Sequence, residues 1–173
     1  AYYSRTDSQQ ISAEGTAQTD LNSFCLGACF VEVEVDVPLC KVEVKNVVQV
    51  HDSGRIINPA TAAGQVHGGI AQSVGFCLFE ELIEDSANGR TLNDNFLDYK
   101  IPTMLDLPDL TAEFVETWDP TGPFGNKSLG EPPAIPAAPA IRDAILDATG
   151  VKLYEAPMTP QRLFEGFKEA GLV

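Results

Sequence analysis

The chain has 173 residues, with 25 acidic and 11 basic residues that give a net charge of -14. This length is enough for one domain with its own core. The acidic balance argues against nucleic acid and anionic membranes as partners, because both bind basic patches. No apolar run approaches the roughly 20 residues of a membrane span. No signal peptide opens the chain, so we expect a cytoplasmic location.

Residues 1–22 are rich in Gln, Ser and Thr, which predicts a loop or an arm lying against other parts of a larger protein. The chain begins without Met. We therefore expect residues 1–173 to be a single domain that is a fragment, or a split part, of a longer subunit.

The first regular elements are predicted to be strands. Residues 30–36 alternate Val and Glu, which is typical of a half-exposed strand. Residues 37–40 predict a turn and residues 42–50 a second strand, so the pair forms a hairpin. Residues 110–117 also alternate and predict a further strand.

A long helix is predicted from Pro59 to about Leu82, with Asn58 as its cap. It contains four glycines, Gly64, Gly68, Gly69 and Gly75. Each costs roughly 0.8–1 kcal/mol relative to Ala. All but Gly69 fall on nearly one face, which indicates close packing against either a neighbouring helix or a bulky cofactor.

The rest of the chain mixes loops and helices. Residues 84–90 predict a polar turn, residues 91–102 a mixed segment with Tyr99 and Ile101 buried, and residues 118–125 a loop. A helix is expected over 134–148, with an apolar stripe of Ile135, Ile141, Ile145 and Leu146. Thr159 predicts the cap of a last helix that starts at Pro160. The fold class is α+β, a mixed sheet with a β-hairpin and packed helices.

One carboxylate stands out locally. Glu131 lies between Gly130 and two prolines, ahead of an Ala-rich run. A carboxylate held in a rigid, weakly polar turn suits a general base. The alternative is a helix-start residue favoured by the helix dipole.

The cysteines and histidines do not predict a metal site. Cys25, Cys29, Cys40 and Cys77 lack the spacing of zinc ligands, and buried thiols in a reducing compartment are the simpler interpretation. His51 and His67 are expected to be structural, and a loop-fixing pair of Asp52 with Arg55 is also expected.

Five motifs occur together in a fixed order: residues 51–59 (HDSGRIINP), 64–75 (GQVHGGIAQSVG), 95–102 (NFLDYKIP), 125–133 (GNKSLGEPP) and 156–160 (APMTP). Over about residues 30–167 the chain thereby resembles the C-terminal part of the molybdenum-cofactor subunit of the xanthine dehydrogenase family, the molybdenum hydroxylases. The hairpin turn departs from the family, which usually has a Thr-Gly type turn there.

The resemblance implies a cofactor and a reaction. The cofactor is molybdenum-molybdopterin, with or without a dinucleotide form, and the pterin dithiolene holds the metal, so no protein ligand is needed. The reaction hydroxylates an aromatic N-heterocycle with oxygen from water. Electrons pass to iron–sulfur clusters and FAD on partner chains of a multi-subunit complex. The isolated fragment is expected to be inactive.

The resemblance also implies roles for residues. Glu131 matches the family's general base, and Gln65, with Gly64 and Gly68, matches the pterin contact; Gln72 is a weaker candidate. Lys127 is expected either to hold negative charge on a ligand or to be solvated. Phe124 and residues 122–126 form either a wall of the substrate funnel or a simple turn.

The substrate is less constrained. Two prolines after Glu131 resemble the branch that oxidises xanthine, hypoxanthine or nicotinate in purine catabolism and related routes, with aldehydes as the alternative. A non-catalytic domain that docks a partner subunit stays open. A hydrolase is disfavoured, because no nucleophile motif lies near either histidine.

Overall fold

The computed structural model describes residues 14–16 and 20–173. Its elements are β1 (Leu26–Asp36), β2 (Lys41–Asp52), α1 (Pro59–Leu78), β3 (Asp109–Phe114), the 3-10 turns η1 (Pro123–Gly125) and η2 (Pro132–Ala134), α2 (Ala137–Thr149) and α3 (Pro160–Glu169). The strand order is β1-β2-β3, antiparallel between β1 and β2 and parallel between β2 and β3. The predicted α+β class with a hairpin in a mixed sheet is confirmed. The single-domain organisation over 1–173 stays a prediction.

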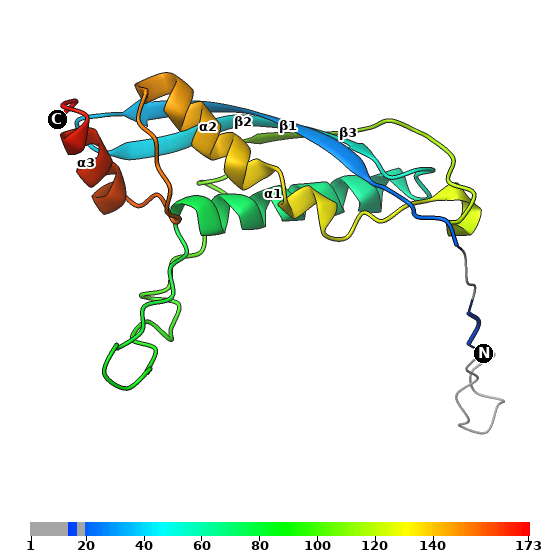
Figure 1. Ribbon diagram of the computed structural model, residues 1–173, viewed down its shortest axis with the longest axis horizontal. Coiled ribbons are helices and arrows are strands. Elements are labelled where there is room, and N and C mark those ends of the chain that lie inside the picture. The colour runs from blue at the N-terminus through cyan, green and yellow to red at the C-terminus, as the bar shows by residue number, and fades with distance from the viewer. Residues whose placement is uncertain (1–13, 17–19) are drawn as a thin grey trace.

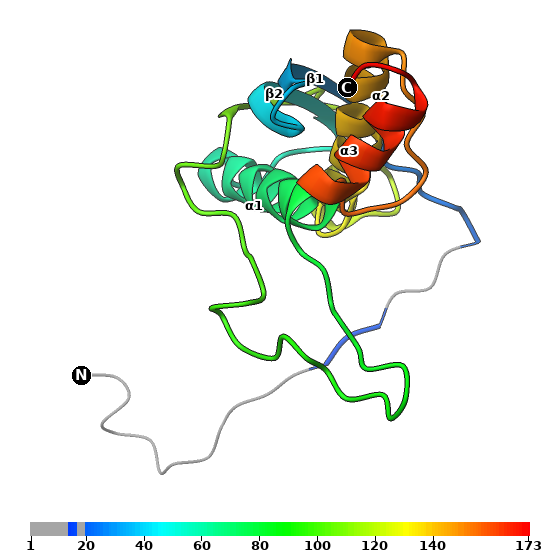
Figure 2. The same ribbon diagram turned by 90° about the vertical axis from the view of Figure 1, so that its left-hand side faces the viewer.

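Two helices cover the sheet. α2 packs mainly on β1, whereas α1 packs on β3 and β2 and also contacts α2 (Figure 1). Seen at right angles, the strands form one layer and α1 and α2 form the other (Figure 2). Between the layers lie the fully buried side chains Val47, Val66, Ile70, Val74, Ile141 and Ile145, and Phe167 of α3 belongs to the same core.

The hairpin contains a bulge that decides which side chains of β2 face the helices. Glu32 pairs with Asn46 but Val33 pairs with Val44, so Lys45 is the extra residue. Before the bulge Val44 is buried, and after it the buried positions are Val47, Gln49 and His51. Two polar side chains thereby enter the interior. Both strands are longer than the predicted ranges.

α1 begins where its sequence predicts and ends earlier. The Asn58 side chain accepts hydrogen bonds from the backbone N–H groups of Ala60 and Thr61 at 3.1 and 3.3 Å. The last helical residue is Leu78, not Leu82. Met158 N–H donates to the Cys77 carbonyl at 2.7 Å, which ties this end of α1 to the segment before α3.

The two later helices are partly as expected. α2 begins at Ala137 rather than residue 134, because residues 132–134 form the separate turn η2. Ile141 and Ile145 are buried as predicted, but the prediction for Ile135 is wrong, since 69% of it is exposed. The cap of α3 is confirmed: Thr159 Oγ1 accepts a hydrogen bond from Arg162 N–H at 3.4 Å.

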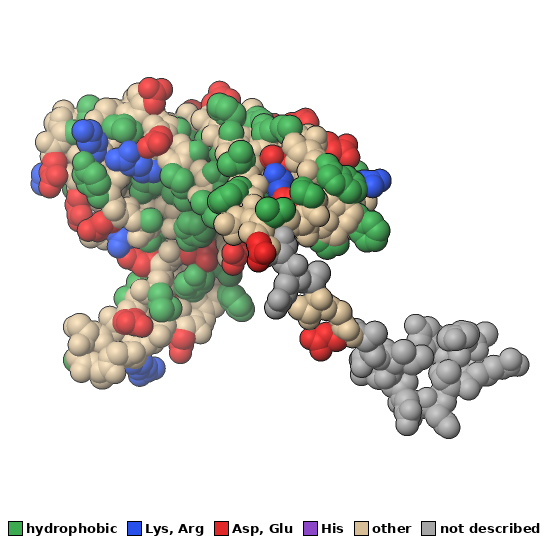
Figure 3. Space-filling view, turned by 45° about the vertical axis from the view of Figure 1, so that its right-hand side comes forward, with side chains coloured by type: hydrophobic (Ala, Val, Ile, Leu, Met, Phe, Trp, Pro, Cys, Tyr) green, Lys and Arg blue, Asp and Glu red, His purple; other side chains and the backbone are tan. Residues whose placement is uncertain are grey.

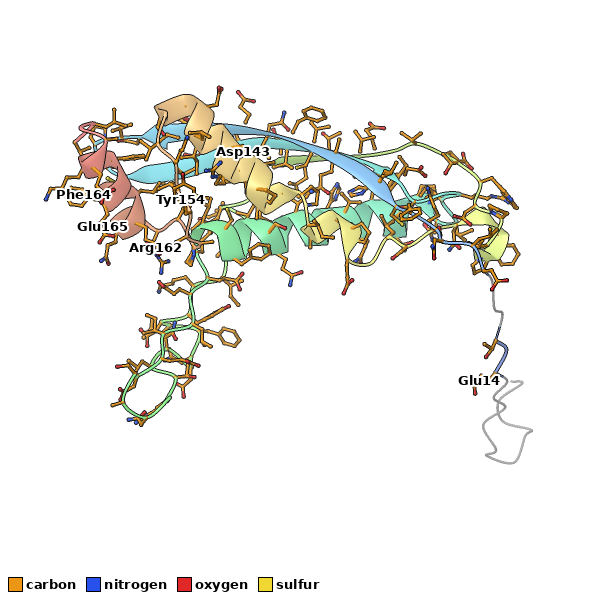
Figure 4. The ribbon with its side chains drawn as sticks, viewed as in Figure 1. Glu14, Asp143, Tyr154, Arg162, Phe164 and Glu165 are labelled. Carbon is orange, nitrogen blue, oxygen red and sulfur yellow. The ribbon has the colours of Figure 1, made fainter. Side chains whose placement is uncertain are left out.

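Residues 80–106 form an arm that leaves the body after α1 and returns before β3 (Figures 1 and 2). Buried Asn93 joins the two segments of chain where the arm leaves the body. It accepts a hydrogen bond from Ile83 N–H at 2.9 Å and donates one to the Glu81 carbonyl at 2.6 Å. Arg162 of α3, labelled in Figure 4, also reaches Glu81, at 2.5 Å. Ile101 is 51% exposed, so its predicted burial is wrong. Tyr99 is half-buried rather than buried.

Two expectations concern the ends and the surface. Of the predicted arm at 1–22, residues 1–13 and 17–19 lie outside the described residues, and residues 14–16 and 20–22 contain no helix or strand. Acidic side chains outnumber basic ones on the face in Figure 3, in keeping with the net charge of -14. Within the described ranges, no helix is long and apolar enough to cross a membrane.

Candidate functional site

The Glu131 segment is anchored first at the end of β2. Arg55 N–H donates to the Gly125 carbonyl at 2.9 Å, and Lys127 N–H donates to the Ser53 carbonyl at 2.7 Å. An isolated bridge pairs Gly54 with Asn126. Gly54 has a φ of 68°, and a Cβ there would lie 2.4 Å from the Gly125 carbonyl oxygen, so the close approach requires glycine. These contacts fix where the segment starts.

Lys127 strengthens that anchor through an ion pair. Its Nζ lies 2.8 Å from Asp52 Oδ1, and only 8% of its side chain is exposed. Thr117 Oγ1 donates to the same carboxylate at 2.6 Å. The hydrogen bond from Lys127, with help from Thr117, holds the Asp52 pKa below its ordinary value. The prediction of a solvated Lys127 is therefore wrong, its contact with a ligand stays a prediction, and Asp52 pairs with Lys127 rather than Arg55.

Beyond the anchor, four side chains donate to four carbonyls of residues 128–134. We call this set the carbonyl clamp. Its members are Cys25 Sγ to Ser128 at 3.1 Å, Gln65 Nε2 to Gly130 at 2.6 Å, Gln49 Nε2 to Pro133 at 3.1 Å and Ser73 Oγ to Ala134 at 2.7 Å. The donors come from the chain before β1, from β2 and from α1. The clamp therefore holds a segment whose own prolines cannot donate.

Close packing completes the docking. A Cβ on Gly69 would lie 2.6 Å from Pro133 Cβ and 2.9 Å from the Pro133 carbonyl carbon. Pro133 itself is buried. Gly69 thus lets the turn η2 sit directly on the backbone of α1, and glycine is required there by space rather than by conformation.

The same helix has an open face next to this contact. A Cβ on Gly64 or Gly68 would meet nothing within 4 Å. Gly75, predicted on that face, instead packs against Glu80 and Pro102. The glycines of α1 therefore divide into a pair packed by this chain, Gly69 and Gly75, and a pair left open, Gly64 and Gly68.

A surface hollow of about 590 Å³ lies between the open face and the clamped turn. Its lining is Gln65, Gly68, Gly69, Gln72 and Phe76 from α1, and Gly130, Glu131, Ala134 and Ile135 from the turn. The structure thus brings together Glu131, Gln65, Gly68 and Gln72, as the sequence-based hypothesis requires. Gly64 is exposed one residue before Gln65.

Glu131 is the one charged residue among the described residues that line this hollow. Its carbonyl accepts a hydrogen bond from Ala134 N–H at 2.9 Å, which closes the turn. Its carboxylate is exposed and makes no hydrogen bond or ion pair within residues 14–16 and 20–173. It does not cap α2, which starts only at Ala137. The backbone of Glu131 is fixed, while its carboxylate has no partner among the described residues.

Other candidates lie elsewhere. His51 is 1% exposed, and its Nε2 pairs with Gln49 Oε1 at 2.8 Å, so it is a satisfied core histidine, as expected. Phe124 shares a separate hollow of about 270 Å³ with Arg55, Ile56 and Ile57. All four cysteines are free. No group of three potential metal ligands occurs in the described part of the chain.

Sequence reasoning missed three members of the clamp, Gln49, Ser73 and Cys25. A signal for Gln49 was present, because it and His51 are polar residues two apart in an otherwise Val-rich strand. The bulge at Lys45, which turns both inward, has no comparable signal in the sequence.

The two kinds of glycine predict opposite effects of the same substitution. Gly68→Ala should raise the free energy of unfolding by about 0.5–1 kcal/mol, because the methyl group meets nothing and Ala favours helix. Gly69→Ala should lower it by about 1–3 kcal/mol through overlap with Pro133. Urea unfolding of both variants measures this, and a shift of the same sign in both would contradict the assigned packing.

His51 predicts a pH effect on stability. Burial lowers its pKa below the ordinary value, so the folded protein keeps the ring neutral at a pH where the unfolded chain binds a proton. Stability should therefore fall as the pH drops below about 6.5. His51→Gln keeps an N–H donor but does not titrate. Its stability should fall less than that of the wild type between about pH 7 and pH 5. Equal losses in urea unfolding would be the contrary result.

The chain matches a known family model, the molybdopterin cofactor-binding domain, over residues 1–108. It is 50% identical over all 173 residues to the xanthine dehydrogenase molybdenum-binding subunit of Escherichia coli O157:H7, and it spans 23% of that protein. It is 39% identical over 139 residues, 79% of the chain, to the nicotine 6-hydroxylase large subunit of Paenarthrobacter nicotinovorans, of which it spans 17%.

A solved structure agrees with these relatives. Quinoline 2-oxidoreductase from Pseudomonas putida 86 matches 79% of this chain and 18% of its own chain, with 38% identity and a TM-score of 0.74. The chain thus spans about a quarter or less of the proteins that it matches. It belongs to the molybdopterin cofactor-binding domain family, within the molybdenum hydroxylases of the xanthine dehydrogenase family.

Proposed function

We propose that this chain forms one wall of the cofactor site of a molybdenum hydroxylase, with Glu131 as the general base. The observation that carries the proposal is the hollow itself. A carboxylate without a partner in the described residues lies beside a helix face whose glycines meet nothing. A general base needs a fixed backbone position and a carboxylate that is available to accept a proton.

The open face fits a bulky cofactor that approaches the helix backbone. Gly64 and Gly68 leave space where other residues would place a Cβ. Gln65 uses its Nε2 for Gly130, so its amide oxygen is free to accept a hydrogen bond from the mixed polar edge of a pterin. We assign Gln65, Gly64 and Gly68 to the molybdenum-molybdopterin cofactor, with Gln72 a weaker candidate on the same lining.

The residues of this chain would hold the cofactor and accept a proton. When bound, the molybdenum cofactor supplies the two-electron redox chemistry of hydroxylation, with oxygen from water. Glu131 would accept a proton at a carboxylate oxygen during this hydroxylation. The clamp fixes the backbone from which that carboxylate extends, since the chain on both sides of Glu131 is held by hydrogen bonds.

For the substrate we propose an aromatic N-heterocycle of the xanthine, hypoxanthine or nicotinate type. The two prolines after Glu131 favour this class, and relatives named for xanthine and nicotine match the chain at 50% and 39% identity. An aldehyde is the alternative within the same chemistry. The relatives extend well beyond the matched segment, so further substrate contacts belong to the rest of the subunit.

The proposal includes partners. The remaining part of the molybdenum subunit would close the cofactor site, and iron–sulfur and FAD chains would take the electrons. Phe96 and Leu105 on the arm are 87% and 96% exposed, which suits burial against other parts of a complex. The same exposure favours the second candidate function, a docking domain without a catalytic role. Free cysteines are typical of a reducing compartment, and a cytoplasmic location is part of the proposal.

Glu131→Gln tests the catalytic role in the assembled enzyme. The amide keeps the shape of the side chain but cannot accept the proton, so turnover should fall by at least about 100-fold while molybdenum content is retained. Glu169→Gln, an exposed acid at the end of α3, is the matched control and should keep full turnover. Steady-state assays normalised to bound molybdenum decide the matter. Unchanged turnover in Glu131→Gln would leave docking as the better function.

The isolated chain should bind little cofactor, because one helix face and one turn offer only an open hollow. Metal analysis of the purified 173-residue chain, after mixing with molybdenum cofactor and gel filtration, measures this directly. Stoichiometric molybdenum would mean that this chain encloses the cofactor alone.

A further inference from the structure

The hydrogen bond from Gln49 to the Glu131 turn is part of a buried hydrogen-bond network that begins at His51. Gln49 is fully buried and His51 is 1% exposed. Gln49 Nε2 donates to the Pro133 carbonyl at 3.1 Å, and Gln49 Oε1 lies 2.8 Å from His51 Nε2. No charged group takes part in these bonds, so these hydrogen bonds join the C-terminal end of β2 to the Glu131 turn through neutral groups.

The directions of these bonds follow from chemistry. The Pro133 carbonyl can only accept, so the amide NH₂ of Gln49 must point toward it. The amide oxygen then faces His51, whose Nε2 must carry the proton. His51 Nδ1 lies against the backbone of β1, since a Cβ on Gly27 would come within 3.0 Å of it. His51 thereby satisfies the Gln49 amide oxygen in the one orientation in which the amide NH₂ donates to Pro133.

The hydrogen bond between Gln49 and Pro133 lies close to Glu131, the proposed general base. Pro133 lies two residues after Glu131 inside η2, and the Glu131 carbonyl closes this turn by accepting from Ala134 N–H at 2.9 Å. Ser73 Oγ holds the next carbonyl, that of Ala134, at 2.7 Å. A shift of Pro133 would therefore move the backbone of Glu131 with it.

We propose that Gln49, oriented by His51, is a positioning residue for Glu131. It acts through the Pro133 carbonyl and touches neither substrate nor cofactor. The bulge at Lys45 makes this possible, because it turns Gln49 and His51 to the helix side of the sheet. The inference rests on the proposed role of Glu131 and extends it to the strand behind the turn.

The test compares variants of the assembled enzyme by kcat per bound molybdenum and by KM. Gln49→Leu removes both the amide donor and the amide acceptor and leaves a slightly shorter, apolar side chain. We expect kcat to fall by about 10- to 100-fold, because small displacements of a catalytic group cost that much, with KM within about twofold. Asn93→Leu is the control, since it removes an equally buried amide that holds only the arm. Its kcat per molybdenum should not change.

Two further substitutions separate positioning from folding. His51→Leu should lower kcat in the same direction, and His51→Gln should restore much of it, because its amide can still donate to Gln49 Oε1. If Gln49→Leu does not assemble, the comparison of His51→Leu with His51→Gln decides the matter. Wild-type kcat per molybdenum in the variants that assemble, with only thermal stability reduced, would overturn the proposal.

Glu131→Gln measured alongside distinguishes the two proposals. Loss of turnover in Glu131→Gln together with wild-type kcat in Gln49→Leu would overturn the positioning role alone. Full turnover in Glu131→Gln would overturn the role of Glu131, and the positioning role with it.

Discussion

The site depends on the docking of residues 128–134 across α1. A segment that contains two adjacent prolines cannot join a sheet or a helix by its own donors. Here its carbonyls are satisfied instead by side chains that reach in from separate elements. Because buried carbonyls without partners are costly, the buried bond to Pro133 and the half-buried bond to Ala134 favour one position of the turn most strongly. The result is a rigid backbone at Glu131 without a helix or strand to provide it.

The second constraint is the division of α1 into a closed and an open face. Toward the sheet it presents Val66, Ile70 and Val74, which are fully buried. Toward the hollow it presents glycine and glutamine. Gly64 and Gly68 lower the stability of the helix, and no described residue packs against them to compensate for that loss. This cost is explained if a group outside this chain lies on the helix backbone. The docked turn and the open face share the hollow, so one event, binding of the cofactor, would use both.

Much of the architecture was predictable because it follows from local patterns. Alternating Val and Glu indicated β1, and Asn58 and Thr159 indicated the starts of α1 and α3, since these depend on neighbours in sequence. Glu131, Gln65, Gly68 and Gln72 of the hollow were predictable through the family resemblance of residues 64–75 and 125–133. The composition of the clamp was not, because its donors and acceptors are separated by up to 103 residues.

The errors have a shared cause. One expectation for Lys127 was a solvated side chain, but a carboxylate at the end of β2 lies within 2.8 Å of it. Ile135 fits a helical stripe by spacing, yet the turn η2 ends just before it and leaves it exposed. In each case a tertiary contact or a break in the helix, neither visible in local periodicity, decided the outcome.

The most direct measurement is the crystal structure of the assembled enzyme with its cofactor. The account predicts the pterin against Gly64, Gln65 and Gly68, and the Glu131 carboxylate pointing at the molybdenum centre from the clamped turn. A carboxylate that faces bulk solvent, or a protein side chain filling the hollow in place of the pterin, would contradict it.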